Sequence, residues 1–339
     1  MNNKVQLPFS IPMISTFHNA AATGIAMAEN KNAQIQILNQ CTDLMCDRKF
    51  LHGYSSPVVE LPETSFLTFS NLERYCVNLR YVYDFHSELI KSMLRDGKYV
   101  HYSFVDDYYL PGKSWYGTKH HYHDGTICGY DDESQCYSIA AYDTNWVYRL
   151  IDIPQAAFAD AVAHSFENGM YGNLNAFAAK SDHIELNIPG IVSRLKKFLA
   201  SDFEHNPTSG EGKVRGIAVY DYIIIYFDML LRDEIEYEKI DWRVLKAIYD
   251  FRKCMLKRII AIEEALNIET KLSDEYSKVV EETDRLRILY AICTKKRRDT
   301  LLTSVRDGIL KLKEDETSIL RNLIILTEEA ITSKKGEEK

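Results

Sequence analysis

The feature that most limits the possible folds of this chain is an abrupt change in composition near residue 207. All ten histidines and all eight prolines lie at or before Pro207, and only two of the fifteen glycines follow Gly216. Proline and glycine mark turns and end helices, so a segment almost without them favours long helices. The turn-forming stretch 205–216 is typical of a linker. We therefore predict two domains, residues 1–205 and residues 206–339.

The second domain is predicted to be an all-α helical bundle. Apolar residues recur at three- and four-residue steps in four segments: 219–232, 242–266, 271–295 and 301–332. This spacing gives each helix one apolar face, and in the last segment the repeat is close to a heptad. Antiparallel packing of such faces gives a bundle core.

The first domain combines both kinds of secondary structure. Periodicity and turn residues predict helices at 20–30, 72–79, 87–94 and 154–163, and strands at 99–104, 125–130, 137–142 and 147–151. The last three of these strands follow one another through short polar turns at 131–134 and 143–145, which favours antiparallel pairing. Helices followed by an antiparallel sheet indicate an α+β arrangement, because a doubly wound sheet would alternate strand and helix.

Composition and charge exclude several classes of protein. The net charge of −8 argues against a chain that binds nucleic-acid phosphates. We see no apolar run of the roughly 18 to 20 residues that a membrane span needs, and no signal peptide at the start. The seven cysteines are an odd number without a CxxC pair. We expect a cytoplasmic protein with neither a membrane nor a nucleic-acid partner.

Three histidines, His120, His121 and His123, stand within four residues of one another. On a strand, His121 and His123 share a face, and His120 points to the other. Such a pair can bind a metal, can be exposed at a strand edge, or can supply a general base. Because no Cys, Asp or Glu with ligand spacing accompanies the pair, we expect no metal and place His121 in a groove or on the surface.

The general-base interpretation pairs His123 with Asp143. His123 begins one predicted strand and Asp143 ends the next, so antiparallel pairing brings both to one end of the sheet. A carboxylate that accepts a hydrogen bond from one imidazole nitrogen leaves the other nitrogen free as a base. We therefore predict a hydrogen bond between His123 and Asp143.

The segment around these histidines resembles a known family. The sequences DDYYLP at 106–111, GYDD at 129–132 and YD at 142–143, with a lysine–histidine stretch ahead of His123, are similar to a papain-fold, C39-peptidase-like family. The N-terminal domain of the butirosin-biosynthesis acyltransferase typifies this family, and the amide synthases of polythioamide (closthioamide-type) biosynthesis look related to it. The resemblance implies a papain-like cysteine-protease fold, followed here by the helical bundle.

The resemblance also implies an activity, an acyltransferase or amide synthase of natural-product biosynthesis. In such proteins a cysteine at the start of the first helix takes an acyl group from a carrier-protein thioester and passes it to an amine. His123 matches the base and Asp143 the orienting carboxylate. No separate cofactor is expected, because phosphopantetheine arrives on the carrier protein. The residues expected to line the substrate groove are Asn19, Asp107, Tyr108, Tyr109, Trp115 and His121.

The expected nucleophile is missing from this chain. The matching position falls between His18 and Ala22, at or beside Ala20, where the sequence holds no cysteine. A thiol there would have a pKa lowered by the positive end of the helix. Cys41 is the alternative nucleophile, although its surroundings are polar and charged. We predict that the thiol belongs at Ala20 and that the chain as written is inactive.

The sequence also leaves two alternative functions open and contains one candidate docking surface. A catalytically inactive papain-fold protein could act as a binding or scaffold protein, and a cysteine peptidase could act on a leader peptide. The densest basic cluster is expected either to be a solvated turn between helices or to dock an acidic partner such as a carrier protein. It consists of Arg285, Lys295, Lys296, Arg297 and Arg298.

Overall fold

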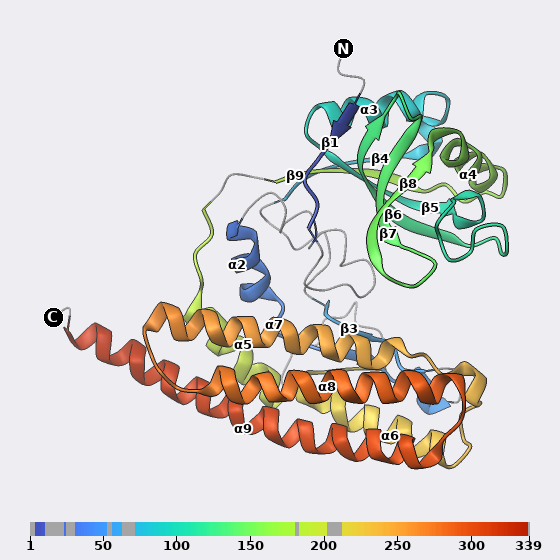
Figure 1. Ribbon diagram of the computed structural model, residues 1–339. Coiled ribbons are helices and arrows are strands. Elements are labelled where there is room, and N and C mark those ends of the chain that lie inside the picture. Colours follow the sequence, from blue (N-terminus) through green and yellow to red (C-terminus); the bar gives the residue numbers. More distant parts are fainter. Residues whose placement is uncertain are drawn as a thin grey trace. The chain divides into compact units, whose positions relative to one another are not determined.

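The chain folds into two compact units, drawn in the computed structural model of Figure 1. The structure describes residues 4–10, 24, 31–52, 56–62, 72–179, 183–201 and 212–337. The first unit comprises residues 1–34 and 65–184, and the second comprises residues 35–64 and 185–339. The fold is mixed α and β, with an antiparallel sheet in the first unit and a helical region in the second.

The first unit is built on one antiparallel sheet. Its strand order is β4 (Leu72–Asn78), β9 (Asn173–Ala179), β5 (Tyr99–Asp106), β6 (Tyr122–Asp131), β7 (Cys136–Tyr142) and β8 (Tyr148–Pro154). The short strand β1 (Lys4–Gln6) pairs with the far end of β6. The run from β6 to β8 is a meander, since its polar turns let each strand pair with the next.

Two helices share a hydrophobic core with this sheet. The helix α3 (His86–Arg95) contributes Ile90, and α4 (Gln155–Glu167) contributes Phe158. Phe158 packs edge-on against the Tyr102 ring of β5, with 5.2 Å between ring centroids. Proline at the end of β8 fixes the backbone just before α4 and so supports an abrupt start of that helix. This core holds β5, β6 and α4 together, and these elements carry the candidate site.

A β-bulge interrupts β5 just before the candidate site. Tyr102 pairs with Gly125 and Val105 pairs with His123, so Ser103 and Phe104 together oppose the single residue Asp124 of β6. Phe104 has φ +57°, in the left-handed region that a phenylalanine rarely occupies. An extra residue bends the strand and changes which face the following side chains occupy. The bulge therefore sets the direction of the acidic residues at the end of β5.

Most elements predicted for the first domain are confirmed. The structure has all four predicted strands, as β5 to β8, and the predicted helices at 87–94 and 154–163, as α3 and α4. The helix predicted at 72–79 is wrong, because this segment is the edge strand β4, paired with β9 along its whole length. Its middle is exposed, so no apolar alternation marked it as a strand. The helix predicted at 20–30 lies outside the described residues apart from Gly24.

The second unit contains the four predicted long helices. They are α6 (Val219–Leu231), α7 (Arg243–Leu266), α8 (Leu272–Lys295) and α9 (Asp299–Glu337). Figure 1 shows α7, α8 and α9 running alongside one another. Among the described residues, no helix combines the length and the apolar character that crossing a bilayer requires.

The helical unit also includes segments that the sequence analysis assigned to the first domain. The helix α5 (Ile188–Ala200) and most of α2 (Lys31–Gln40) belong to it. So does a small sheet in which β2 (Met45–Asp47) pairs with β3 (Val59–Glu60) and β10 (Lys213–Arg215). This division differs from the predicted boundary after residue 205.

Contacts distant in sequence explain the difference. The Phe198 ring of α5 lies 5.2 Å from the Phe251 ring of α7, and Lys196 pairs with Glu328 of α9 at 2.7 Å. The buried guanidinium of Arg258 in α7 donates to the carbonyls of Leu38 (2.7 Å) and Cys41 (2.6 Å), at the C-terminal end of α2. Helix ends carry unpaired carbonyls, so Arg258 anchors α2 in this unit.

Candidate functional site

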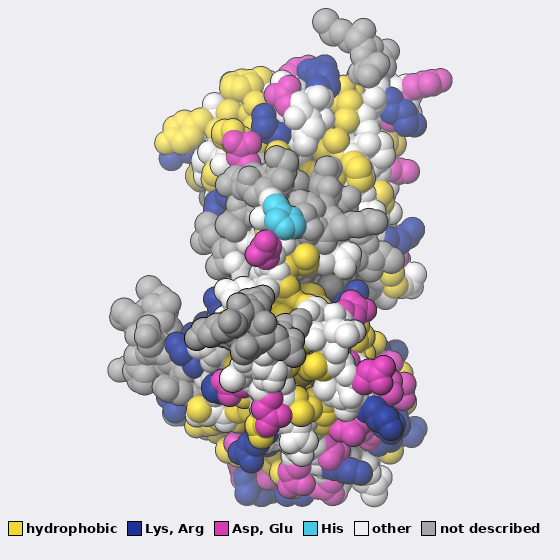
Figure 2. All heavy atoms as spheres, turned by 90° about the vertical axis from the view of Figure 1, so that its left-hand side faces the viewer, with side chains coloured by type: hydrophobic (Ala, Val, Ile, Leu, Met, Phe, Trp, Pro, Cys, Tyr) yellow, Lys and Arg dark blue, Asp and Glu magenta, His cyan; other side chains and the backbone are white. Residues whose placement is uncertain are grey.

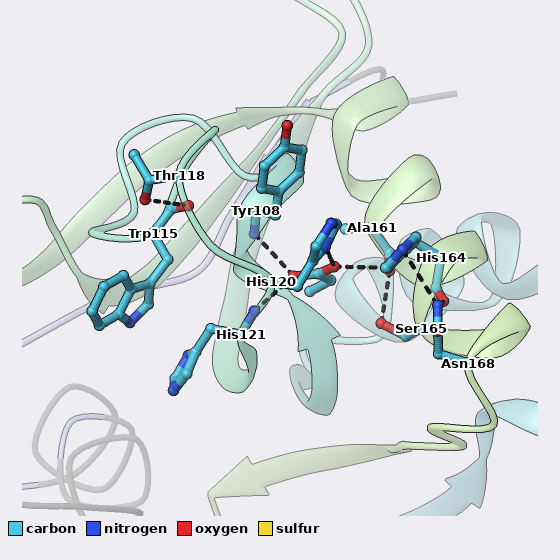
Figure 3. A network of polar contacts seen from close by, with 10 residues as sticks. Tyr108, Trp115, Thr118, His120, His121, Ala161, His164, Ser165 and Asn168 are labelled. Carbon is cyan, nitrogen blue, oxygen red and sulfur yellow. Dashed lines mark hydrogen bonds and ion pairs between the residues drawn. The ribbon is translucent and has the colours of Figure 1, made fainter.

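The candidate site lies where β5 ends and β6 begins. Asp106 closes β5, Asp107 opens the following short helix η5 (Asp107–Tyr109), and residues 110–121 lead to β6. Antiparallel pairing of β5 with β6 sets Asp106 opposite Tyr122, so the acidic pair and the three clustered histidines come to one edge. Figure 3 shows this edge, with the side chains converging from the loop and from α4.

Asp106 is the centre of a hydrogen-bond network. Its carboxylate is fully buried, and Oδ1 accepts bonds from the amides of Tyr108 (3.1 Å) and His121 (3.0 Å). The other oxygen, Oδ2, lies 2.7 Å from Nδ1 of His120 and 2.8 Å from Nδ1 of His164. Burial alone would raise the pKa of Asp106, but the bonds from His120 and the two amides outweigh it, so the pKa is lowered.

The two imidazoles beside Asp106 are stacked. The rings of His120 and His164 are nearly parallel, with centroids 4.4 Å apart, and Tyr108 stacks on His120, also at 4.4 Å. Figure 3 shows His120 and His164 next to each other, while His121 points away from both. The sequence analysis missed Asp106 and His164 as site residues. His164 lies on α4, and only the packing of α4 against β5 brings it here.

A second, adjacent group is built around Asp107. Its Oδ1 lies 3.3 Å from Nζ of Lys113, and its Oδ2 lies 3.6 Å from Nδ1 of His121. Asp107 and Lys113 are both buried, which makes this an ion pair shielded from water. The ring of His121 lies near those of Trp115 and His123, at centroid distances of 5.7 and 5.2 Å. Asp107, Trp115 and His121, predicted to line one groove, do come together.

His123 has the features of a general base. Its Nδ1 lies 3.2 Å from the main-chain oxygen of Asp124 and 3.2 Å from the Oδ1 of the same residue. A carbonyl oxygen can only accept, so Nδ1 carries the proton and Nε2 keeps a lone pair. Burial lowers the pKa of His123; the charge of Lys113 acts in the same direction, and that of Asp124 opposes it. The imidazole is partly exposed, so Nε2 is within reach of another molecule.

Asp143 is not the hydrogen-bond partner of His123, and the predicted pair is corrected here. Oδ1 of Asp143 accepts from the amides of Asn145 (2.8 Å) and Val147 (2.9 Å), and Oδ2 accepts from Nε of Arg149 at 2.6 Å. The Val147 amide, followed by Arg149, lowers the pKa of Asp143 although burial opposes this. The carboxylate therefore stabilises the turn after β7, and Asp124 is the carboxylate beside His123.

The structure describes only one of the two predicted nucleophile positions, Cys41. Asn19 and Ala20, with the whole span His18 to Ala22, lie outside the described residues. Cys41 belongs to the helical unit and is fully buried. Its hydrogen bond to Cys254, together with Arg258, lowers the pKa of the Cys254 thiol to about 7 against the effect of burial. A thiol enclosed in this way has no exposed surface for a thioester to approach.

Tyr108 and Tyr109, which were predicted to line a groove, contact the stacked imidazoles. The rings of the two tyrosines meet edge to face at 5.2 Å, and the Tyr109 ring lies 5.3 Å from that of His164. Burial, followed by the charge of Asp106, raises the pKa of Tyr109. Both tyrosines thus contact the Asp106 group, whereas Trp115 contacts the Asp107 group.

The basic cluster between α8 and α9 is partly neutralised. Arg285 pairs with Glu282 at 2.5 Å, and Arg297 pairs with Asp233 and Asp299. Lys295, at the end of α8, and Lys296 and Arg298, in the loop that follows, are exposed. On the face of the helical unit seen in the lower half of Figure 2, basic and acidic side chains are interspersed.

Comparison with protein-family models and with curated proteins gives no relative from which to assign a role. The chain matches no protein-family model, and no curated protein matches it significantly. The arrangement of the site therefore carries the functional argument.

Proposed function

We propose that this chain is an acyltransferase or amide synthase that moves an acyl group from a carrier-protein thioester to an amine, with His123 as general base. The observation that carries the proposal is the state of His123. Its Nδ1 is held by Asp124, its pKa is lowered, and its ring is partly exposed. A neutral imidazole with a free Nε2 near pH 7 is what proton abstraction needs.

One neighbouring charge supports this role. Lys113 places a positive charge near His123 and so favours the neutral imidazole. Asp107, which lies 3.3 Å from Lys113 and 3.6 Å from His121, acts on the pKa of His123 in the opposite direction, and the lowered pKa is the net result of burial and these charges. The ring of His121 lies beside that of His123, and the Trp115 indole beside His121 would offer an apolar surface to an acyl chain or pantetheine arm.

The reaction would run through a thiol at the position of Ala20. Nε2 of His123 takes the thiol proton, and the thiolate attacks the thioester carbonyl. The carrier's pantetheine sulfur leaves with that proton as its thiol. The amine then attacks the acyl-enzyme, gives its proton to His123, and the enzyme sulfur leaves as thiolate and is reprotonated. As written, the chain lacks the thiol, so we expect it to bind the donor without forming the acyl-enzyme.

Mass spectrometry of the chain offered acyl-pantetheine thioesters and a panel of amines tests the proposal. We expect no adduct on the chain as written, a covalent acyl adduct on Ala20→Cys, and amide product when an amine is added. His123→Asn in the Ala20→Cys background should remove both, whereas His52→Asn, at an exposed histidine, should not. An adduct on the unmodified chain that disappears in Cys41→Ala would overturn the assignment of the nucleophile.

One observation favours a second candidate, an inactive binding or scaffold protein. The span His18 to Ala22 holds no cysteine, and the alternative Cys41 is buried. Measurable binding of an acidic carrier protein to the chain as written, with no adduct or amide from Ala20→Cys, would support this candidate. Charge reversal at Lys295 and Lys296 would then test whether the basic loop is the docking surface. Cleavage of a leader peptide would support the peptidase instead.

A further inference from the structure

We infer that Asp106, His120 and His164 form a binding site for one divalent first-row transition-metal ion. This site is separate from the His123 group, and nothing in the proposed acyl transfer uses it. One ligand atom from each of these residues lies within 4.8 Å of the other two, and we assign Oδ2 of Asp106 and Nδ1 of each histidine as the ligands because these atoms are the ones in contact.

The spacing of these atoms suits coordination. Nδ1 of His120 and Nδ1 of His164 lie 2.7 and 2.8 Å from the same carboxylate oxygen. Two donors bound at about 2.1 Å to one ion are roughly 3.0 Å apart at a right angle and roughly 3.4 Å apart at a tetrahedral angle. Shifts of a few tenths of an ångström at the two imidazoles would therefore admit an ion.

The contact between His164 and Asp106 has the distance of a hydrogen bond but not its alignment. Nδ1 of His164 is buried and has no hydrogen-bond partner in the structure. This nitrogen lies 2.8 Å from Oδ2 of Asp106, but the in-plane direction of its N–H or lone pair does not point at that oxygen. A lone pair on Nδ1 therefore points into the space beside Oδ2. A cation bound there would receive both lone pairs.

The buried charge of Asp106 also favours a bound cation. This carboxylate is fully buried, and no Lys or Arg side chain among the described residues pairs with it. Buried carboxylates are normally paired with cations or coordinate metals, because desolvation of an unpaired charge is costly. Among the described residues, the partners of this carboxylate are the two imidazoles and the amides of Tyr108 and His121, and those amides fix Oδ2 toward the histidines.

The donor set and its exposure define the kind of ion. Two imidazoles and one carboxylate, without thiolate, suit zinc, iron(II), cobalt(II) or nickel(II) better than calcium or magnesium. The side chain of His120 is 49% exposed and that of His164 is 23% exposed. Three protein ligands at an open edge leave further coordination positions for water or another molecule.

Asn168 contacts His164 in a way that would favour a metal-free arrangement of the group. Its amide nitrogen lies 3.3 Å from Nε2 of His164 and donates to the His164 carbonyl at 2.8 Å. If that nitrogen also donates to Nε2, then Nδ1 carries the proton and the group is a metal-free array of two imidazoles on one carboxylate. Metal binding at Nδ1 requires the proton on Nε2 instead. Metal titration distinguishes the two arrangements.

The experiment uses the full chain without an affinity tag, freed of metal by a chelator and titrated with Zn²⁺ alone and Co²⁺ alone. We expect one ion per chain by calorimetry and elemental analysis, visible absorption bands from bound Co²⁺, and a melting temperature that rises with Zn²⁺. His120→Asn and His164→Asn should each weaken binding at least about tenfold. His52→Asn, at an exposed histidine outside the site, should leave binding unchanged.

Any of three results would overturn the inference. The first is an absence of binding by a folded chain, and the second is binding that survives in both His120→Asn and His164→Asn. Far-ultraviolet circular dichroism of each variant checks that it is folded, and Asp106→Asn serves as a third variant because it keeps the side-chain shape. Loss of binding in His121→Asn or His123→Asn, with His164→Asn unaffected, would also overturn it by moving the ion to the other histidine pair.

Discussion

Lys113 lies opposite Asp143 in an isolated antiparallel bridge, and this bridge ties the 110–121 loop to the turn after β7. Two further bonds strengthen the junction: Ser114 Oγ donates to the Asp143 carbonyl at 2.8 Å, and the Thr144 amide donates to the Gly112 carbonyl at 3.1 Å. Because Lys113 also pairs with Asp107, Asp143 acts on the histidine group by positioning the loop.

Asp143→Ala is expected to destabilise the first unit by about 2–3 kcal/mol, because it leaves two amides and a guanidinium without their acceptor. Arg149→Ala is the matched control. The Arg149 side chain is 58% exposed, so its removal should cost less than about 1 kcal/mol. Denaturant unfolding of both variants gives the comparison. Equal and small losses would contradict the positioning role.

Acidification should destabilise the protein through Asp106 and Asp143. Both carboxyl groups have lowered pKa values in the folded chain. Their contribution is therefore complete above the unfolded-state pKa of about 4 and is lost as the pH falls through the lower folded-state value. Urea unfolding at pH 6, 5, 4 and 3 should show this fall, and Asp143→Asn should reduce its slope. The same slope in that variant would contradict the assignment.

His123 should titrate below the value of about 6.5 that is usual for an unperturbed imidazole. Substitution Lys113→Met removes a positive charge that lowers this pKa, so the midpoint should rise in that variant. Arg149→Ala, which removes a charge outside the group that acts on His123, is the control. Nuclear magnetic resonance of histidine ring signals against pH measures all three proteins. A midpoint that falls in Lys113→Met would refute the electrostatic argument.

Relief of backbone strain should stabilise the bulge in β5. Phe104 has φ +57°, and its side chain is half exposed, so little packing is lost when it is replaced. Glycine adopts this conformation without steric cost, whereas alanine keeps the strain. We expect Phe104→Gly to be more stable than Phe104→Ala by about 1 kcal/mol in chemical unfolding. Equal stability of the two variants would show that the position is unstrained.

The helical unit holds a fully buried ion pair between Arg252 and Glu316, at 3.0 Å. Thr283 Oγ1 accepts from Arg252 at 2.7 Å, and Tyr276 donates to Glu316, so the group is internally bonded. Arg252→Met strands a buried carboxylate and should cost about 3–5 kcal/mol. The double variant Arg252→Met with Glu316→Gln removes both charges and should recover part of this loss. A double-mutant cycle with no coupling would contradict the prediction.

Much of the secondary structure followed from local pattern. The four long helices have apolar residues on one face over many turns, and β6, β7 and β8 are separated by turns rich in Asp, Asn and Ser. Such patterns act within one element, so one chain displays them without knowledge of its neighbours. The edge strand β4 escaped prediction because its identity rests on hydrogen bonds to β9, far along the chain.

The site was predictable only in part for the same reason. The sequence alone shows that His120, His121 and His123 are clustered and that a loop connects them to Asp107. It does not show which carboxylate each imidazole contacts. A single inserted residue at the bulge in β5, the capping of the turn by Asp143, and the approach of His164 on α4 decide which carboxylate meets which imidazole.

The sequence by itself determined the division of composition, the helices of the second unit, the antiparallel meander, and a segment dense in histidine and aspartate. Tertiary structure decided that residues 35–64 and α5 belong with the helices, that Asp124 and not Asp143 lies beside His123, and that His164 joins Asp106. The physical reason is the separation along the sequence over which each kind of interaction acts. Periodicity and turn preference act over a few residues, whereas hydrogen-bond directions and buried charges are fixed by elements that meet only after the chain has folded.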